Sequence, residues 1–490
     1  MIPTPKVDWL ALAPTLALLG ASGVALLGSV LVPRALARGF AALVTFAGFV
    51  TAGVLAAIVF DESAEARPLI AESFTRDRLG ALAALIVAGA GALTVLVAWG
   101  ERRRDHAGEY YALLAAAGAG MAFFVTASNL MTLFLGLEWF SIALYVLCAM
   151  DTHREESLES GLKYLIVGSF GSAILLFGSA LVYGATGELG FSEIAAATGG
   201  EEDVMLLAGL AMLLAGLGFK ASAAPFHMWT PDVYQGAPTS VTAFMSAATK
   251  VAALVLTLRL LVVAFPEQEH LWTVAVAVLA IVSLAWGNLA ALAQRDVKRL
   301  LAYSSVSHAG FMLIAIAANN ELGGRALLYY LIPYGAMSIG SFAVVAARER
   351  ELQAPVTLER LGGLGWERPF LGAAMWVFML GFMGMPLTGG LIGKFYVFSA
   401  AYEAGWWWLI VAGVIATAIS LYYYLGVVRA LYLRPAAEPG RTPVVVGGSP
   451  PRDPLLQTAV GLCVAVTVGS FFLVQPLIDL ARDAAASLPL

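Results

Sequence analysis

Long apolar runs alternate with short polar stretches along the whole chain. Runs of about 18 residues or more are long enough to cross a bilayer as helices. About fourteen such runs are expected, at 9–32, 37–60, 79–99, 109–127, 129–150, 161–184, 204–225, 239–264, 271–293, 300–318, 325–347, 370–400, 406–432 and 455–480. The pattern predicts an all-α polytopic membrane protein, with one membrane domain over 1–490.

Two of these runs carry a proline close to a lysine. The run at 370–400 is too long for one simple helix, and its segment GFMGMPLTGGLIGKF predicts a break at Met385–Pro386. In the run at 204–225, Lys220 is followed by Pro225. Broken helices in both halves of a membrane protein indicate a transporter's ion site. The lysine precedes the proline in one run and follows it in the other, which is the order that an inverted repeat would produce.

Composition supports the membrane assignment and excludes several other classes. Hydrophobic residues make up 60% of the chain and charged residues only 12%, and mean hydropathy is +0.83. Both cysteines, Cys148 and Cys463, fall inside apolar runs, so no disulfide framework or metal-binding spacing is expected. The net charge of −5 is spread along the chain, and the sequence shows no cluster of basic residues that indicates nucleic-acid binding. The first run is too long for a signal-peptide core and is expected to be an uncleaved span.

The distribution of Lys and Arg predicts the orientation. About 17 lie on one side and about 6 on the other, and the richer side is expected to be cytoplasmic. The richer side carries Arg34, Arg38, Arg102–Arg104, Arg154, Arg295, Lys298, Arg299, Arg348, Arg350, Arg360, Arg368, Arg429, Arg434, Arg441 and Arg452. The loops at 61–78, 185–203 and 265–270 are then outside, together with both termini. The longest loop, near 433–454, is rich in Pro and Gly and is expected to be flexible.

Five basic residues and one acid stand out within the predicted spans. A charge at the bilayer centre costs about 2.5–3.5 kcal/mol, so such residues tend to face the bundle interior and to mark ion pathways. The six are Glu138, Lys163, Lys220, Lys250, Arg259 and Lys394.

Position within the span separates these residues. Arg259 lies near the outer end of its span and is expected to extend its side chain to the membrane surface. For Lys163, near the start of its span, position alone leaves a structural and a functional role equally open. Glu138, Lys250 and Lys394 have apolar residues on both sides, which favours function.

Two further positions depend on their surroundings. Lys220 joins the functional set if its helix is broken, because the break could admit water to it. His308 follows Ser304, Ser305 and Ser307. A lone histidine is more often a packing residue, but these hydroxyls favour a proton relay. The aromatic clusters at 406–408 and 422–424 are expected to belong to the interfacial belt or to pack.

The chain carries no nucleotide-binding loop, haem ligand pair, iron–sulfur cysteine set or nucleophile elbow. If redox chemistry is involved, its cofactors are expected in other chains.

Four segments resemble one family of membrane proteins. They are FLGLEWFSIALYVLCAM (134–150), the stretch 157–187 around Lys163, GLGFKASAAPFHMWTPDVYQGAP and its continuation to Lys250, and RDVKRLLAYSSVSHAGFML (295–313). They look like the antiporter-like subunit N of bacterial NADH–quinone oxidoreductase, complex I. The resemblance covers nearly the whole chain. It implies fourteen helices with two inverted five-helix repeats, at 109–264 and 271–432, each with a broken helix, and flanking helices at 9–99 and 455–480.

The resemblance also implies roles for single residues. By motif, six positions match the family's proton-translocating residues: Glu138, Lys163, Lys220, Lys250, His308 and Lys394. It further implies that the chain is a proton-translocating subunit of a bacterial cell-membrane enzyme and that its partners are other membrane-arm subunits. The chain itself would hold no cofactor, and NADH, FMN, iron–sulfur clusters and quinone would be bound by partner subunits.

Two alternatives remain beside this interpretation. Subunits of multisubunit Na⁺/H⁺ antiporters share the fold, although the local sequence around Lys163 and Lys220 favours complex I. A passive scaffold within the membrane arm is disfavoured because unused charges in a membrane are costly.

Overall fold

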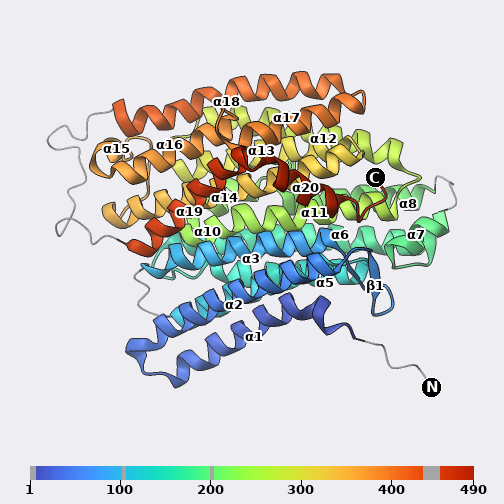
Figure 1. The fold of residues 1–490 in the computed structure, drawn as a ribbon, viewed down its shortest axis with the longest axis horizontal. Coiled ribbons are helices and arrows are strands. Elements are labelled where there is room, and N and C mark those ends of the chain that lie inside the picture. The colour runs from blue at the N-terminus through green and yellow to red at the C-terminus, as the bar shows by residue number, and fades with distance from the viewer. Residues whose placement is uncertain (1–6, 102–105, 199–202, 434–452) are drawn as a thin grey trace.

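The computed structural model describes residues 7–101, 106–198, 203–433 and 453–490. Most of these residues form long helices that lie side by side along one direction (Figure 1). Most of the expected flexible loop, residues 434–452, lies outside the described residues, as do Lys6, Arg102–Arg104, Arg434, Arg441 and Arg452.

The elements follow the predicted runs closely. The helices are α1 Trp9–Leu31, α2 Arg34–Glu62, α3 Arg78–Trp99, α4 Ala107–Phe124, α5 Leu130–Cys148, α6 Glu155–Thr186, α7 Phe191–Thr198, α8 Val204–Ala221, α9 Trp229–Gly236, α10 Thr239–Phe244, the π-helical turn Met245–Thr249, α11 Lys250–Ala264, α12 Glu269–Leu292, α13 Val297–Ala317, α14 Glu321–Leu352, α15 Leu364–Glu367, α16 Pro369–Met383, α17 Gly389–Glu403, α18 Trp407–Leu433, α19 Pro454–Phe472 and α20 Val474–Ala485. Two short strands, β1 Arg67–Leu69 and β2 Phe74–Arg76, pair antiparallel.

Within the described ranges, twelve helical segments are long and apolar enough to cross a membrane, with α10 to α11 counted as one. The protein is therefore a multi-pass membrane protein. The predicted count of fourteen is reached if α4 and the interrupted pair α16–α17 also cross, and it stays a prediction.

Many helices begin at an acidic or amide side chain. Such a side chain accepts a hydrogen bond from one of the backbone N–H groups that the first turn leaves free. The capping residues are Asp8, Asp77, Asn129, Asp203, Asp296, Asn320 and Asp453. The short polar stretches between apolar runs thus fix where the helices start.

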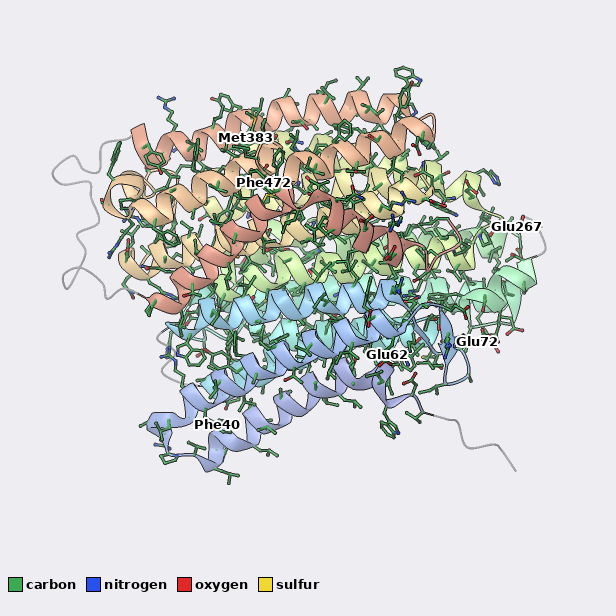
Figure 2. All side chains as sticks on the ribbon, in the orientation of Figure 1. Phe40, Glu62, Glu72, Glu267, Met383 and Phe472 are labelled. Carbon is green, nitrogen blue, oxygen red and sulfur yellow. The ribbon has the colours of Figure 1, made fainter. Side chains whose placement is uncertain are left out.

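One end of the bundle carries the hairpin β1–β2, α7 and the C-terminus (Figure 1), and Asp8, which caps α1, bonds there to Arg76 of β2. The backbone at Thr75 bonds to Thr126 and that of Leu130 to Leu189, so the loops around these residues meet there. In Figure 2, Glu72 and Glu267 lie at this same end. The loops predicted to share one side of the membrane with the termini therefore do share one end.

Two helices are broken, as the sequence predicts. Helix α8 ends at Ala221, and Ser222 takes a left-handed conformation with φ of 61°, three residues before Pro225. Helix α16 ends at Met383, which lies away from both ends of the bundle in Figure 2, and Gly384 has φ of 77°. The break expected at Met385–Pro386 is confirmed.

The expected snorkelling of Arg259 is wrong. Its side chain is only 3% exposed and forms two contacts with the carboxylate of Asp77, at 2.5 and 2.9 Å. Asp77, which caps α3, is itself 1% exposed in its side chain. Because a carboxylate lies at the same depth, the guanidinium needs no route to water.

The last predicted run, 455–480, is two helices rather than one. Helix α19 ends at Phe472 and α20 starts at Val474, and α20 carries polar residues such as Asp479, Arg482 and Asp483. Leu490, at the end of the chain, lies beside Gly324 near the start of α14.

Close approach of helices positions the first break. A Cβ at Gly178 of α6 would lie 2.9 Å from the carbonyl oxygen of Gly209 of α8, and the reverse distance is also 2.9 Å. Small residues let two backbones approach this closely in a membrane. The contact holds α8 against α6, and so fixes the environment of Lys220 at the end of α8.

Candidate functional site

Lys220 lies in the last turn of α8 and is only 2% exposed. Its Nζ donates a hydrogen bond of 2.7 Å to Oγ of Ser141 on α5. Four aromatic rings surround the ammonium, with Nζ at 5.2–5.7 Å from each centroid: Phe140, Tyr145, Tyr164 and Phe219. The negative faces of aromatic rings attract a cation, most strongly where water is excluded. The pocket thus suits a lysine that is charged for part of the time.

Glu138 lies on α5 one helical turn before Ser141. Its Oε1 is buried and has no hydrogen-bond partner among the described residues. Lys220 bonds to Ser141, so its ammonium reaches α5 within one turn of the residue that carries the Glu138 carboxylate. The pairing of the two charges stays a prediction.

Lys250 is the first residue of α11, directly after the π-helical turn. Its Nζ donates to the carbonyl oxygen of Ala221 at 3.1 Å and to that of Ser305 at 2.8 Å. A helix end leaves its last carbonyls unpaired, and an unpaired carbonyl at membrane depth is costly. Lys250 therefore stabilises the break in α8 and connects it to α13.

His308 lies on α13 between two tyrosines. Its Nδ1 is 2.8 Å from Oη of Tyr330, and its Nε2 is 3.1 Å from Oη of Tyr424. Tyr424 also hydrogen-bonds to Ser304. The sequence predicted the nearby hydroxyl of Ser304 but not the tyrosines. Tyr424 is fully buried and stacks on Phe382, which confirms packing rather than a membrane belt, and its hydroxyl also bonds to His308.

Lys394 stabilises the second break. Its Nζ donates to the carbonyl oxygens of Phe382 at 2.9 Å and Met383 at 3.3 Å, both in the last turn of α16. It lies 4.6 Å from the ring centroid of Phe311 on α13. The ring of Phe382 stacks on Tyr424 with centroids 5.6 Å apart and contacts His308 at 5.1 Å. Lys394 and His308 are therefore separated by one layer of aromatic side chains.

Lys163 lies apart from the buried set. Its side chain is 44% exposed and forms ion pairs with Glu159 at 2.7 Å and Asp232 at 3.0 Å. Asp232 also pairs with Arg299 at 2.5 Å. The neighbouring residue of Lys163 in the chain is Tyr164, one of the rings around Lys220. Lys163 thus lies on the exposed side of α6, whereas the next residue, Tyr164, lines the pocket of Lys220.

Sequence reasoning missed a further buried cation. Lys298, expected in a cytoplasmic loop, lies in the first turn of α13 and is buried. Its Nζ donates to the carbonyl oxygen of Ala237 at 2.8 Å and to Oγ1 of Thr239 at 3.0 Å, and lies 3.7 Å from Oε1 of Glu349. The capping residue Asp296 is nearby, and burial raises the pKa of its carboxyl despite hydrogen bonds from the backbone. In the sequence Lys298 lies between Arg295 and Arg299, and nothing in this basic stretch indicates that the Lys298 side chain turns inward.

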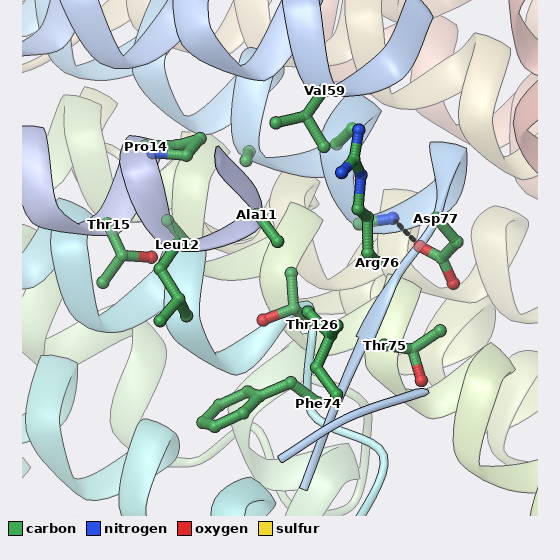
Figure 3. A pocket seen from close by; sticks show the side chains of 15 residues that line it. Ala11, Leu12, Pro14, Thr15, Val59, Phe74, Thr75, Arg76, Asp77 and Thr126 are labelled. Carbon is green, nitrogen blue, oxygen red and sulfur yellow. Dashed lines mark hydrogen bonds between the residues drawn. The ribbon is translucent and has the colours of Figure 1, made fainter. Parts of the chain in front are cut away.

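A pocket lies between the hairpin and helices α1 to α4 (Figure 3). Pro14, Phe74, Arg76 and Thr126 are among the residues that line it, and none of the six predicted site residues does. Among the described residues, no group of three or more His, Cys, Asp or Glu side chains is placed to hold a metal ion.

Comparison with known proteins shows the family of this chain. The family described as NADH:quinone oxidoreductase/Mrp antiporter, transmembrane, matches residues 127–420. NADH-quinone oxidoreductase subunit N of Trichlorobacter lovleyi is 41% identical over 84% of this chain and 85% of its own length. A chain of respiratory complex I from Thermus thermophilus is 33% identical, with a TM-score of 0.79 over 96% of this chain and 99% of its own. A chain of the Mrp complex from a Dietzia species is 22% identical over 98% and 97%, with a TM-score of 0.84, and shows the shared fold alone.

The chain therefore belongs to the family of antiporter-like membrane subunits. Within this family it belongs with the subunit N proteins of NADH-quinone oxidoreductase, respiratory complex I. The alternative of an Na⁺/H⁺ antiporter subunit is less well supported, because the family model covers both classes, whereas the Mrp chain is only 22% identical and the subunit N protein is 41% identical.

Proposed function

We propose that this chain translocates protons as a membrane-arm subunit of NADH–quinone oxidoreductase, along a line from Glu138 and Lys220 through Lys250 and His308 to Lys394. One observation carries this proposal: contacts of the buried basic groups connect both helix breaks to α13. Lys250 binds the carbonyl that ends the helix of Lys220 and a carbonyl of α13, and Lys394 lies against the ring of Phe311, which also lies beside His308. Isolated charges kept only for packing would not need this continuity.

The chemistry follows from the surroundings of Lys220. When the Glu138 carboxylate is near, it stabilises the ammonium form, together with Ser141 and the four rings. When the carboxylate moves away or is neutralised, the buried ammonium loses its main counter-charge. It then releases a proton toward Lys250 and becomes a neutral amine, and Lys250 becomes an ammonium. The total charge is unchanged in this step.

The second half of the line receives this proton. Lys250 returns to the amine as the proton passes along the hydroxyls of Ser304, Tyr424 and Tyr330 that surround His308. A hydroxyl bonded to an imidazole can accept one proton and donate another, as a relay requires. Lys394 would be the last carrier, since its Nζ sits at the break of α16 where backbone groups are exposed to the interior.

The architecture fits the same proposal. The breaks in α8 and α16 support two inverted repeats, at 109–264 and 271–432, with flanking helices at 9–99 and 455–480. In this scheme both termini lie on the outer side of a bacterial cell membrane, and the end with the basic loops is cytoplasmic. The partners would be other membrane-arm subunits, which would also bind NADH, FMN, iron–sulfur clusters and quinone. Lys163 would contribute to proton translocation from outside the buried line, through its ion pairs with Glu159 and Asp232.

The test is Lys220→Ala in the assembled complex. Proton pumping by membrane vesicles, followed with a pH-sensitive dye during NADH oxidation, should fall by about tenfold or more, with quinone reductase activity reduced as well if coupling is tight. Arg325→Ala is the matched control, because Arg325 is a basic residue in an i,i+4 pair with Glu321 at an exposed helix start. Near-normal pumping in Lys220→Ala would refute the central role of Lys220.

A further inference from the structure

Two buried helices carry polar side chains that lead from Lys298 and Glu349 toward Lys250. On α14, Glu349, Ser341, Ser338 and Tyr334 are spaced by eight, three and four residues. Positions three or four apart in a helix lie on one face, and two such steps cover eight residues. The four side chains therefore share one stripe, about 22 Å long by the helical rise. A helix made for packing alone would carry apolar residues along such a buried stripe.

The neighbouring helix repeats the pattern in the opposite direction. Thr239 and Thr242 on α10, Ser246 in the π-helical turn and Lys250 are spaced by three, four and four residues, and all are buried. The two helices pack against each other near Lys250, because a Cβ at Gly335 of α14 would meet the side chain of Ala247 at 3.6 Å. At this end the stripes meet, since Nζ of Lys250 lies 5.8 Å from the ring centroid of Tyr334.

Hydrogen bonds occur at both ends of the two stripes. At one end, Thr239 hydrogen-bonds to Glu349, and Lys298 Nζ reaches both. At the other, Tyr334 donates to Oγ of Ser305 at 2.9 Å, and the carbonyl of Ser305 accepts from Lys250. Between the two ends, Oγ of Ser341 is buried and has no hydrogen-bond partner among the described residues. A buried hydroxyl without a partner marks a place that suits water.

We propose that the cluster of Lys298, Glu349 and Thr239 is a gate through which protons reach Lys250 along the stripes on α10 and α14. Glu349 is the outer member, with 18% of its side chain exposed, whereas the Lys298 side chain is 3% exposed. The proposal rests on the proposed function, since it supplies protons to Lys250, a member of the proposed line. It assigns the three residues of the gate and a direction, from the basic end of the bundle inward.

The proton step is balanced. Glu349 takes a proton from water at the basic end, which neutralises its carboxylate and weakens its attraction to Lys298 and Thr239. The carboxylic acid then gives that proton to the chain of hydroxyls and intervening water. Each member accepts one proton and donates another until the neutral amine of Lys250 becomes an ammonium. Glu349 is again a carboxylate and pairs with Lys298, which closes the gate.

The experiment compares three variants in the assembled complex: Glu349→Gln, Glu349→Asp and Glu321→Gln. Glu321 is the matched control, because it lies on the same helix at the opposite, exposed end and also pairs with a basic residue. We expect Glu349→Gln to lower proton pumping in membrane vesicles by about tenfold or more, Glu349→Asp to recover most of the rate, and Glu321→Gln to leave it unchanged. Recovery by Asp separates a proton-carrying role from a packing role, since a packing role depends on size.

The failures of the two proposals can be told apart with Lys220→Ala. If Lys220→Ala abolishes pumping while Glu349→Gln pumps at the normal rate, the gate is wrong and the proposed function stands. If neither variant changes pumping, both are wrong. Equal losses in Glu349→Gln and Glu349→Asp would overturn the gate in favour of a packing role. If a native gel shows that Glu349→Gln does not assemble, Ser338→Ala with Ser341→Ala decides: reduced pumping supports the path, and normal pumping overturns it.

Discussion

Replacing Glu138 by Gln tests the electrostatic part of the mechanism. The change keeps the shape of the side chain and removes its charge, whereas Glu138→Asp keeps the charge and shortens the side chain. Lys220 contacts α5 at Ser141, one turn from Glu138, and a helical turn advances about 5.4 Å. Two unit charges about 7 Å apart attract each other by about 2 kcal/mol at an effective dielectric constant of about 20.

That energy sets the size of the expected effect. If the transfer step depends on the full attraction, its loss changes the pumping rate by at most about 30-fold. Glu138→Asp should retain most of the rate, because its carboxylate can still approach the ammonium. The assay is initial proton pumping by vesicles at matched amounts of assembled complex, with NADH oxidation measured in parallel. Equal rates in the Gln and Asp variants would show that side-chain size matters at this position and would refute the electrostatic reasoning.

Two other predictions concern stability. Arg259→Met leaves the Asp77 carboxylate buried without its partner, which should cost about 3–5 kcal/mol of stability and lower the thermal midpoint of the solubilised complex. The double variant Arg259→Met with Asp77→Leu should regain most of the lost stability. A single variant as stable as the wild type would contradict the role of the pair. Burial would raise the pKa of Asp8, but hydrogen bonds from Arg76 and the backbone of Ala11 outweigh it and hold the pKa below its ordinary value. A depressed pKa gives stability that is present above the ordinary value of about 3.9 and is lost as the pH falls through the folded value. Asp8→Asn should therefore lower the thermal midpoint at neutral pH and match the wild type at the acid end; a constant difference at all pH values would argue against this.

Some of the candidate site could be predicted residue by residue. Glu138, Lys220, Lys250 and Lys394 were visible because charges stand out in apolar runs and must have a reason to be there. The break beside Lys394 was visible through Pro386, whereas the break beside Lys220 starts at Ser222, three residues ahead of the proline that predicted it. The left-handed turn at Ser222 ends the helix before Pro225 can obstruct it.

Other parts of the site were not visible because they depend on depth and direction. Lys298 and Arg259 are ordinary basic residues near the ends of apolar runs, and hydropathy alone cannot say whether such a side chain turns inward or outward. Lys298 turns inward because Ala237, Thr239 and Glu349 supply three oxygens from two other helices. Tyr330 and Tyr424 were hidden for a similar reason, since a tyrosine in a span serves packing, a membrane belt or a relay equally well.

The sequence by itself determined that this is a polytopic helical membrane protein, roughly where its helices begin and end, and which charges lie within them. Those features depend on local composition, since bilayer thickness fixes span length and a polar cap starts a helix. Helix packing determines which carbonyl each lysine binds, which hydroxyls surround His308, and that the polar stripes on α10 and α14 meet at both ends. Those features depend on contacts between residues far apart in the chain, such as Lys250 with Ala221 or Glu349 with Thr239, which packing of the helices brings together.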